Sequence, residues 1–176
     1  MLASGSLAGL HAVAQAPAMT PTAEALVLMP SARLLGSARL SVWGFDVYDA
    51  SLFVDPGFRA DAYTRTPLAL ELRYLRAFNG KDIAQRSLDE MRRTGPLPDS
   101  QATQWLREMA TVFPDVKKGD RLVGLYQPGD GMRFVFNGVP RGTVGDAAFA
   151  QRFVGIWLAP QTSEPSMRAT LLAIPD

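Results

Sequence analysis

The feature that most constrains the fold is a stretch of mostly apolar and β-forming residues at positions 34–54, which reads L-L-G-S-A-R-L-S-V-W-G-F-D-V-Y-D-A-S-L-F-V. It predicts two strands, residues 33–42 and 45–54, because a two-residue Trp43-Gly44 link between such runs suits a tight reversal. Arg39 lies within this hairpin. An unpaired buried guanidinium is costly, so we expect Arg39 to face a carboxylate of the protein or the anionic or carbonyl head of a ligand.

Along the rest of the chain the apolar pattern switches between a period of two residues and a helical period. Asn79 is expected to cap the first helix and Gly95 to stop it, and Asp146 is expected to cap the third. The order of elements predicts an α+β fold, a large antiparallel sheet with helices packed on one face. The further expected strands cover residues 26–29, 68–76, 116–126 and 132–136, and the expected helices cover residues 80–95, 100–113, a segment after Asp146, and 162–172.

Composition excludes several classes of function. The formal net charge of +1 gives no broad positive field, so nucleic acid is not an expected partner. The chain has no cysteine, which excludes disulfides, thiolate catalysis and cysteine metal sites. Its single histidine, His11, lies in a segment that we expect to be lost from the mature protein, so neither a histidine metal site nor a Ser-His-Asp triad is expected. We therefore expect no metal and no cofactor.

The first 16 residues are small and apolar and end in Ala14-Gln15-Ala16, an A-x-A cleavage pattern before Pro17. The basic region that opens a signal peptide is missing, so either the true start lies upstream or this is an alanine-rich tail. We expect export to the periplasm, with residues 1–25 as a signal-like and linker segment and one domain over residues 26–176. No stretch has the apolar length of a transmembrane helix, so no integral membrane segment is expected.

Four segments in this order and spacing resemble the bacterial branch of the chalcone isomerase-like proteins: the hairpin stretch, F-P-D-V-K-K-G-D at 113–120, F-N-G at 136–138 and F-V-G-I-W-L at 153–158. The resemblance covers roughly residues 26–173. It implies an open-faced β-sandwich, in which a large antiparallel sheet is backed by helices. This expectation agrees with the α+β fold that the periodicity predicts.

Members of that family differ in function. Plant enzymes close a chalcone to a flavanone, whereas related members bind fatty acids without turnover. In both kinds an arginine after a glycine-containing turn faces the ligand, and Gly36-Ser37-Ala38-Arg39 matches that position. The resemblance implies that Arg39 holds a phenolate or polarises a carbonyl in an enzyme, or grips a carboxylate in a binding protein. Tyr48 matches a tyrosine common to the family, and is expected to donate a second hydrogen bond to the same head.

The chain departs from the plant enzymes at two positions. Their catalytic tyrosine, and the asparagine seven residues further on, fall here on Asn79 and Arg86. Ring closure of a chalcone is therefore not expected. Each candidate also has a structural explanation: Arg39 in water or paired with Asp46 or Glu71, Tyr48 as a half-buried core residue with its hydroxyl at the surface, and Arg86 paired with Asp89 or Glu90.

Three functions follow from this reasoning. The first is a non-catalytic protein that binds a small apolar anion, such as a fatty or aromatic acid, with Arg39 and Tyr48 at the head. The tail of that ligand would lie between the sheet and the helices 80–95 and 100–113. The second is an isomerase, an intramolecular lyase that uses Arg39 as the electrophile for an enone or flavonoid-like substrate. The third is an envelope interaction module whose sheet face meets a partner.

Overall fold

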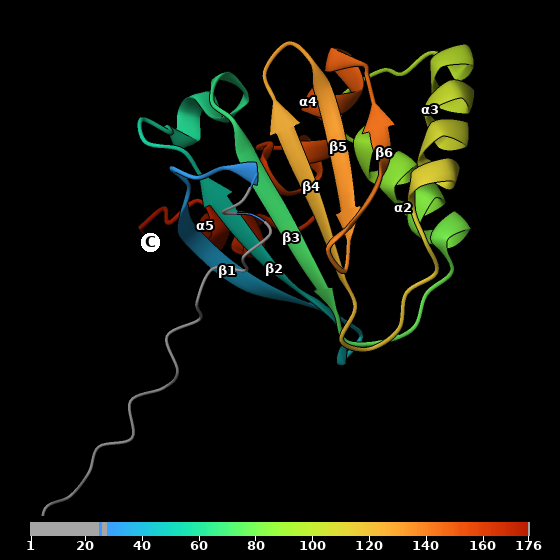
Figure 1. The fold of residues 1–176 in the computed structure, drawn as a ribbon, viewed down its shortest axis with the longest axis horizontal. Helices are drawn as coiled ribbons and strands as arrows, with labels where there is room; N and C mark the ends of the chain where they lie inside the picture. The colour runs from blue at the N-terminus through green and yellow to red at the C-terminus, as the bar shows by residue number, and fades with distance from the viewer. Residues whose placement is uncertain (1–24, 26–27, 176) are drawn as a thin grey trace, which may run out of the picture.

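The computed structural model describes residue 25 and residues 28–175. The cleavage pattern predicted at residues 14–16 lies outside these residues. The chain folds into one antiparallel sheet in the order β1-β2-β3-β4-β5-β6, so each strand pairs with its neighbours in sequence (Figure 1). The strands are β1 (Arg33–Val42), β2 (Phe45–Val54), β3 (Leu68–Tyr74), β4 (Arg121–Gln127), β5 (Gly131–Phe136) and β6 (Val139–Val144). The helices are η1 (Ala60–Arg65, 3₁₀), α2 (Gly80–Arg92), α3 (Asp99–Val112), α4 (Ala147–Leu158) and α5 (Pro165–Leu171).

The β1–β2 hairpin has the bounds that the sequence predicts. Trp43 (φ 50°) and Gly44 (φ 79°) form the two-residue turn, and positive φ at both positions matches the twist of the flanking strands. β1 and β2 each contain one extra residue, a β-bulge, at Leu35 and Val47 respectively. Since the side-chain period of a strand is two, each bulge exchanges the faces to which the following residues point.

The helices lie behind and beside the sheet in Figure 1, all on one side of it. Between the two layers lies the main core, which joins buried residues of the central strands to those of α3 and α4. Aromatic rings of this core meet edge to face, for example Phe113 and Phe134 with ring centroids 5.1 Å apart. The predicted α+β open-faced sandwich, with helices on one face of an antiparallel sheet, is thus confirmed.

The outer face of the sheet carries a second, smaller apolar cluster. Phe53, Ala69 and Leu125 project from neighbouring strands, and Ala25 and Met29 from the N-terminal segment pack on them. The strand expected at residues 26–29 is wrong at its described positions, because residue 28 is helical and Met29 N donates to Ala25 O at 2.8 Å, a helical bond. At its described residues this segment forms no strand pair, and Ala25 and Met29 cover apolar side chains of the sheet.

Helix ends follow the predicted capping in part. Asp146 caps α4, because its carboxylate accepts from the backbone N–H groups of Ala148 and Phe149. Asn79 occupies the N-cap of α2 but makes no capping bond, and Asp115 accepts from Gly80 N at 2.8 Å instead. The expected strand at 116–126 is shorter than predicted, since residues 117–120 form a turn before β4. The 3₁₀ helix η1 was not predicted by the periodicity.

Candidate functional site

Arg39 lies on the outer face of the sheet. Its neighbours Ala38 and Leu40 pack against the helix-side core, and successive residues of a strand point to opposite faces. Two carboxylates hold the guanidinium: Nε donates to Asp49 Oδ1 at 2.7 Å, and Nη1 donates to Asp46 Oδ2 at 2.9 Å. The hydrogen bond and the charge of Asp49 raise the pKa of Arg39, which stays ionised. With 51% of its side chain exposed, Arg39 is not the buried cation that we expected, and its partner Asp46 is the alternative that the sequence left open.

The bulge at Val47 is the reason for this pairing. A two-residue hairpin with unbroken register would place Arg39 opposite Tyr48, on the same face of the sheet. Because Val47 is an extra residue in β2, Arg39 pairs with Asp49 instead. Asp46 pairs with Ser41, on the turn side of the bulge, and already shares the face of Arg39. The bulge brings Asp49 to the same face, so that two acids flank one arginine.

Tyr48 lies on the helix side of the sheet. Its hydroxyl oxygen accepts a hydrogen bond from Trp157 Nε1 of α4 at 3.0 Å. The sheet therefore separates Tyr48 from Arg39, and the expectation that both would hold one ligand head is wrong. Arg39 as a ligand residue by itself stays a prediction, in which a ligand would compete with Asp46 and Asp49.

A second tyrosine stands beside Tyr48. Tyr74 pairs with Tyr48 across β2 and β3, and the two rings meet edge to face with centroids 6.1 Å apart. Tyr74 is only 3% exposed, and it also contacts Phe78, whose ring centroid lies 6.1 Å away. Leu40, which is half-buried and lies opposite Tyr48 in β1, is a further apolar neighbour of the two rings. We call Tyr48 and Tyr74 the tyrosine pair.

The two hydroxyls of the tyrosine pair are neutral donors. Burial is the main cause that raises the pKa of each phenol far above its ordinary value, so neither ionises at physiological pH. Tyr48 accepts from Trp157 but keeps its own proton to donate, and among residues 25 and 28–175 neither Tyr48 nor Tyr74 has an acceptor for that proton. Tyr74 is buried and Tyr48 is half-buried, and the fully buried side-chain oxygen that lacks a partner among the described residues belongs to Asp55 and to neither tyrosine. Each phenol can therefore donate its proton outward, to a carboxylate or carbonyl oxygen.

Charged residues of α2 border the tyrosine pair. Arg86 Nη2 lies 2.7 Å from Glu90 Oε1, and Ser163 Oγ donates to Glu90 Oε2 at 2.8 Å. The charges of Glu164, Glu90 and Arg86 are near enough to influence the Tyr48 hydroxyl. The ion pair between Arg86 and Glu90, which the sequence left as an alternative, is thus observed. The side chain of Arg86 is 72% exposed and brings a positive charge to the border of the tyrosine pair, on the helix side of the sheet.

Sequence reasoning did not single out Tyr74, and it assigned Trp157 to the core. The alternation of residues 68–76 already placed Tyr74 on the buried face, and its pairing with Tyr48 follows from the register of β2 and β3 in the structure. Asn79, at the position of the plant tyrosine, donates to Asp82 Oδ2 at 3.2 Å at the start of α2. It therefore acts within the helix end.

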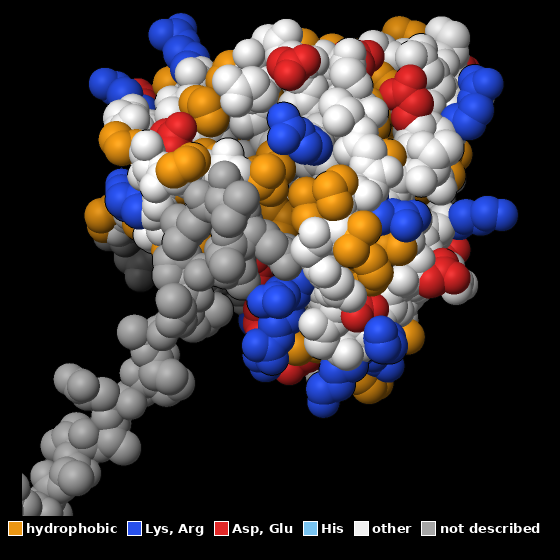
Figure 2. All heavy atoms as spheres, viewed as in Figure 1, with side chains coloured by type: hydrophobic (Ala, Val, Ile, Leu, Met, Phe, Trp, Pro, Cys, Tyr) orange, Lys and Arg blue, Asp and Glu red, His pale blue; other side chains and the backbone are white. Residues whose placement is uncertain are grey.

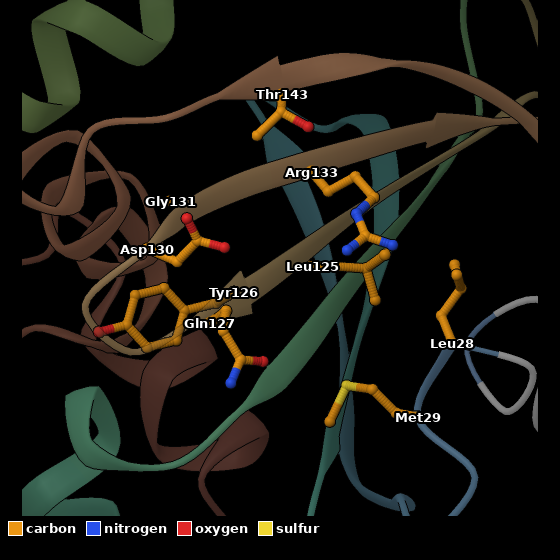
Figure 3. Close-up of a pocket in the computed structure, with 9 residues that line it drawn as sticks. All are labelled: Leu28, Met29, Leu125, Tyr126, Gln127, Asp130, Gly131, Arg133 and Thr143. Carbon is orange, nitrogen blue, oxygen red and sulfur yellow. The ribbon is translucent and has the colours of Figure 1, made fainter.

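The outer face holds a small hollow of about 140 Å³ between the N-terminal segment and β4–β6. Figure 3 shows the guanidinium of Arg133 above Leu125, with Leu28 and Met29 on one side and Asp130 at the far end. The hollow is smaller than the roughly 300 Å³ at which pockets for small molecules usually begin.

The described part of the chain offers little for other chemistry. Within residues 25 and 28–175, no three His, Cys, Asp or Glu side chains gather as metal ligands. Across the same residues no helix has both the length and the apolar character needed to cross a membrane.

Comparisons with known proteins show the family to which this chain belongs. The family model described as chalcone isomerase-like matches residues 15–173. An uncharacterized protein of Haemophilus influenzae is 34% identical over 139 residues, which cover 78% of this chain and 66% of the relative, so the chain spans just under two thirds of that protein. The crystal structure of an Arabidopsis thaliana fatty-acid binding protein is similar in fold, with a TM-score of 0.62 over 81% of this chain and 87% of that one, at 14% identity. The chain therefore belongs to the chalcone isomerase-like family.

Proposed function

We propose that this protein binds a small apolar acid, a fatty or aromatic acid, without chemical turnover. The observation that carries the proposal is the tyrosine pair: two adjacent phenols, Tyr74 buried and Tyr48 half-buried, whose protons have no acceptor among the described residues. Membership of the chalcone isomerase-like family supports it. The similarity in fold to a fatty-acid binding protein adds support, because that protein is named for such a ligand.

The chemistry of the head group follows from the donors. A carboxylate accepts hydrogen bonds at about four lone-pair positions. The two phenols, on neighbouring strands, would donate to two of these positions. Arg86 on α2 supplies the positive charge at the exposed side of the pair, and Glu90 keeps its side chain in place. The tail would contact half-buried apolar residues nearby, such as Leu40, Phe78 and Ile83.

The absence of turnover in this proposal has a physical reason. General base catalysis needs a group that gives up its proton near the working pH, and burial moves the pKa of both phenols in the opposite direction. The same donors would also polarise the carbonyl of an enone, as an oxyanion hole does. An isomerase acting on an enone is therefore the second candidate function, and it would use the same tyrosine pair.

The test measures acid binding after removal of any co-purified lipid. Calorimetry with a series of fatty and aromatic acids should show saturable binding by the wild type. Tyr48→Phe and Tyr74→Phe should each weaken it roughly 10- to 150-fold, which corresponds to the loss of one hydrogen bond to a charged group. Tyr63→Phe is the matched control, because it removes the hydroxyl of a half-buried tyrosine from the 3₁₀ helix η1.

Arg39→Ala separates the two arginine hypotheses. If the head lies at the tyrosine pair, this variant should bind with unchanged affinity, because the sheet separates residue 39 from the ligand. A loss as large as that of Tyr74→Phe would move the head to Arg39 on the outer face. Absence of binding for every acid tested, together with no acid found by native mass spectrometry before lipid removal, would refute the proposal. Conversion of an enone by the wild type but not by Tyr74→Phe would favour the isomerase.

A further inference from the structure

The turn of the β1–β2 hairpin exposes apolar side chains. Trp43 at its tip is 94% exposed, Phe45 beside it is 60% exposed, and Val42 is 40% exposed. Half of the exposed large hydrophobic residues in the described part of the chain therefore lie within four consecutive positions. Isolated apolar residues on a surface are common, but such a group on a projecting turn marks an interaction site. We call Val42, Trp43 and Phe45 the apolar tip.

Cations surround the apolar tip. Arg76, which follows β3, lies over the Phe45 ring with its guanidinium carbon 4.7 Å from the centroid. Arg73 and Arg121 pair across β3 and β4 at the same end of the sheet. Lys118 lies in the turn that leads into β4, next to Gly119, whose N–H donates to the last residue of β3. Figure 2 shows Lys and Arg side chains gathered at the lower end of the molecule, where Figure 1 places this end of the sheet.

These cations keep their charge available. Among the described residues, none of Arg73, Arg76, Lys118 and Arg121 forms an ion pair with an acid. The nearby acids have other partners: Asp46 and Asp49 hold Arg39, and Asp120 accepts from Lys117 and Asn137, as separate contacts show. Among the residues named here, six cations stand beside three acids, so this end of the sheet combines exposed apolar rings with a net positive charge.

We propose that this end of the sheet docks on the surface of an anionic phospholipid bilayer. The apolar tip would enter the interfacial layer, where tryptophan is the preferred side chain, and the four cations would meet the phosphates. A bilayer fits better than a protein groove, because the rings project from a narrow turn and the positive charge is spread around them. The proposal is independent of the tyrosine pair, although docking would bring a site for apolar acids to the place where such molecules dissolve.

The tip contains its own spectroscopic probe. Trp105 is 0% exposed and Trp157 is 6% exposed, so a change in tryptophan emission on mixing with vesicles reports mainly on Trp43. Vesicles of phosphatidylcholine with added phosphatidylserine should shift the emission of the full chain to shorter wavelength and co-sediment with it. Vesicles of phosphatidylcholine alone should do so far less. Removing one cation should weaken binding about fivefold, the factor expected for one basic residue near an anionic surface.

Matched variants isolate the tip. Trp43→Asn, in which asparagine tolerates the positive φ of that position, should abolish the shift and most of the co-sedimentation. Ile174→Asn removes an exposed apolar side chain from the segment after α5, away from the apolar tip, and should bind like the wild type. Arg76→Ser should weaken binding, whereas Arg107→Ser on the exposed side of α3 should not.

Three outcomes would overturn the proposal. The first is that anionic vesicles neither shift the emission nor sediment the wild type. The second is that Trp43→Asn co-sediments with anionic vesicles as well as the wild type does, which would place the membrane contact elsewhere. The third is binding that is equal for neutral and anionic vesicles. Loss of the charge dependence would remove the cations from the mechanism.

Discussion

Replacing Asp146 by alanine should lower the free energy of unfolding by more than is usual for a partly exposed residue. Its Oδ1 accepts from Ala148 N at 2.8 Å and Phe149 N at 3.0 Å, and its Oδ2 accepts from Trp105 Nε1 at 2.9 Å. Loss of a helix cap costs about 0.5–2 kcal/mol. Trp105 is fully buried, so its indole N–H would lose a bond to a charged group, which costs about 1.5–3 kcal/mol.

Together these losses amount to about 2–5 kcal/mol of unfolding free energy. For a domain of this size that corresponds to a fall of roughly 4–20 °C in the melting temperature, with the middle of the range expected. Thermal unfolding followed by circular dichroism measures it. Asp146→Asn should lose less than alanine, because its amide oxygen can still cap the helix. Asp130→Ala, in an exposed turn, is the control and should change little.

The effect should also depend on pH. Burial works against ionisation of Asp146, but the hydrogen bonds from Phe149, Trp105 and Ala148 outweigh it and lower the pKa of the carboxyl. A carboxyl whose folded pKa lies below its unfolded value stabilises the protein above the unfolded value, near 4, and loses that contribution as pH falls through the folded value. The gap between the wild type and Asp146→Ala should therefore narrow in acid. Equal melting temperatures for Asp146→Ala and Asp130→Ala at neutral pH would refute the reasoning.

Two further predictions concern the β1–β2 hairpin. Gly36→Ala should lower the unfolding free energy by about 1–3 kcal/mol, because the new Cβ would lie 2.3 Å from Thr170 O and force α5 away from β1; chemical denaturation measures it, and a neutral result would mean that α5 moves freely. Asp49→Ala should cost at most about 1 kcal/mol, and the loss should shrink with added salt, because the Arg39 pairs are exposed. A larger, salt-independent loss would show that Arg39 is more than a surface ion pair.

The sequence predicted most of the sheet and little of the site, for one physical reason. Strands and helices follow from the spacing of apolar residues, which is why both hairpin strands have their predicted bounds. The face on which Arg39 lies depends on whether one residue, Val47, is an insertion. The residues around Val47 carry no sequence signal of a bulge. A shift of one residue in the register places Asp49 opposite Arg39 in place of Tyr48.

The candidate site was hidden for a related reason. Tyr74 and Trp157 lie 83 positions apart in the sequence numbering used here, yet both meet Tyr48. Helical spacing correctly predicted that Trp157 faces inward, but spacing within one helix does not say which strand it meets. Contacts between residues so far apart in sequence depend on the order and register of the strands, which local spacing does not predict.

The helices α2 and α3 leave the sheet after β3 and return to it at β4, the adjacent strand. Where the chain departs and returns, Tyr74 N donates to Asp120 O, Gly119 N donates to Tyr74 O, and Phe78 bridges to Val116. These contacts close the connection between β3 and β4 at its base, so the pairing of these strands does not depend on the helices between them. A change in the length of this excursion would alter the wall that borders the tyrosine pair and would leave the pairing of the six strands in place.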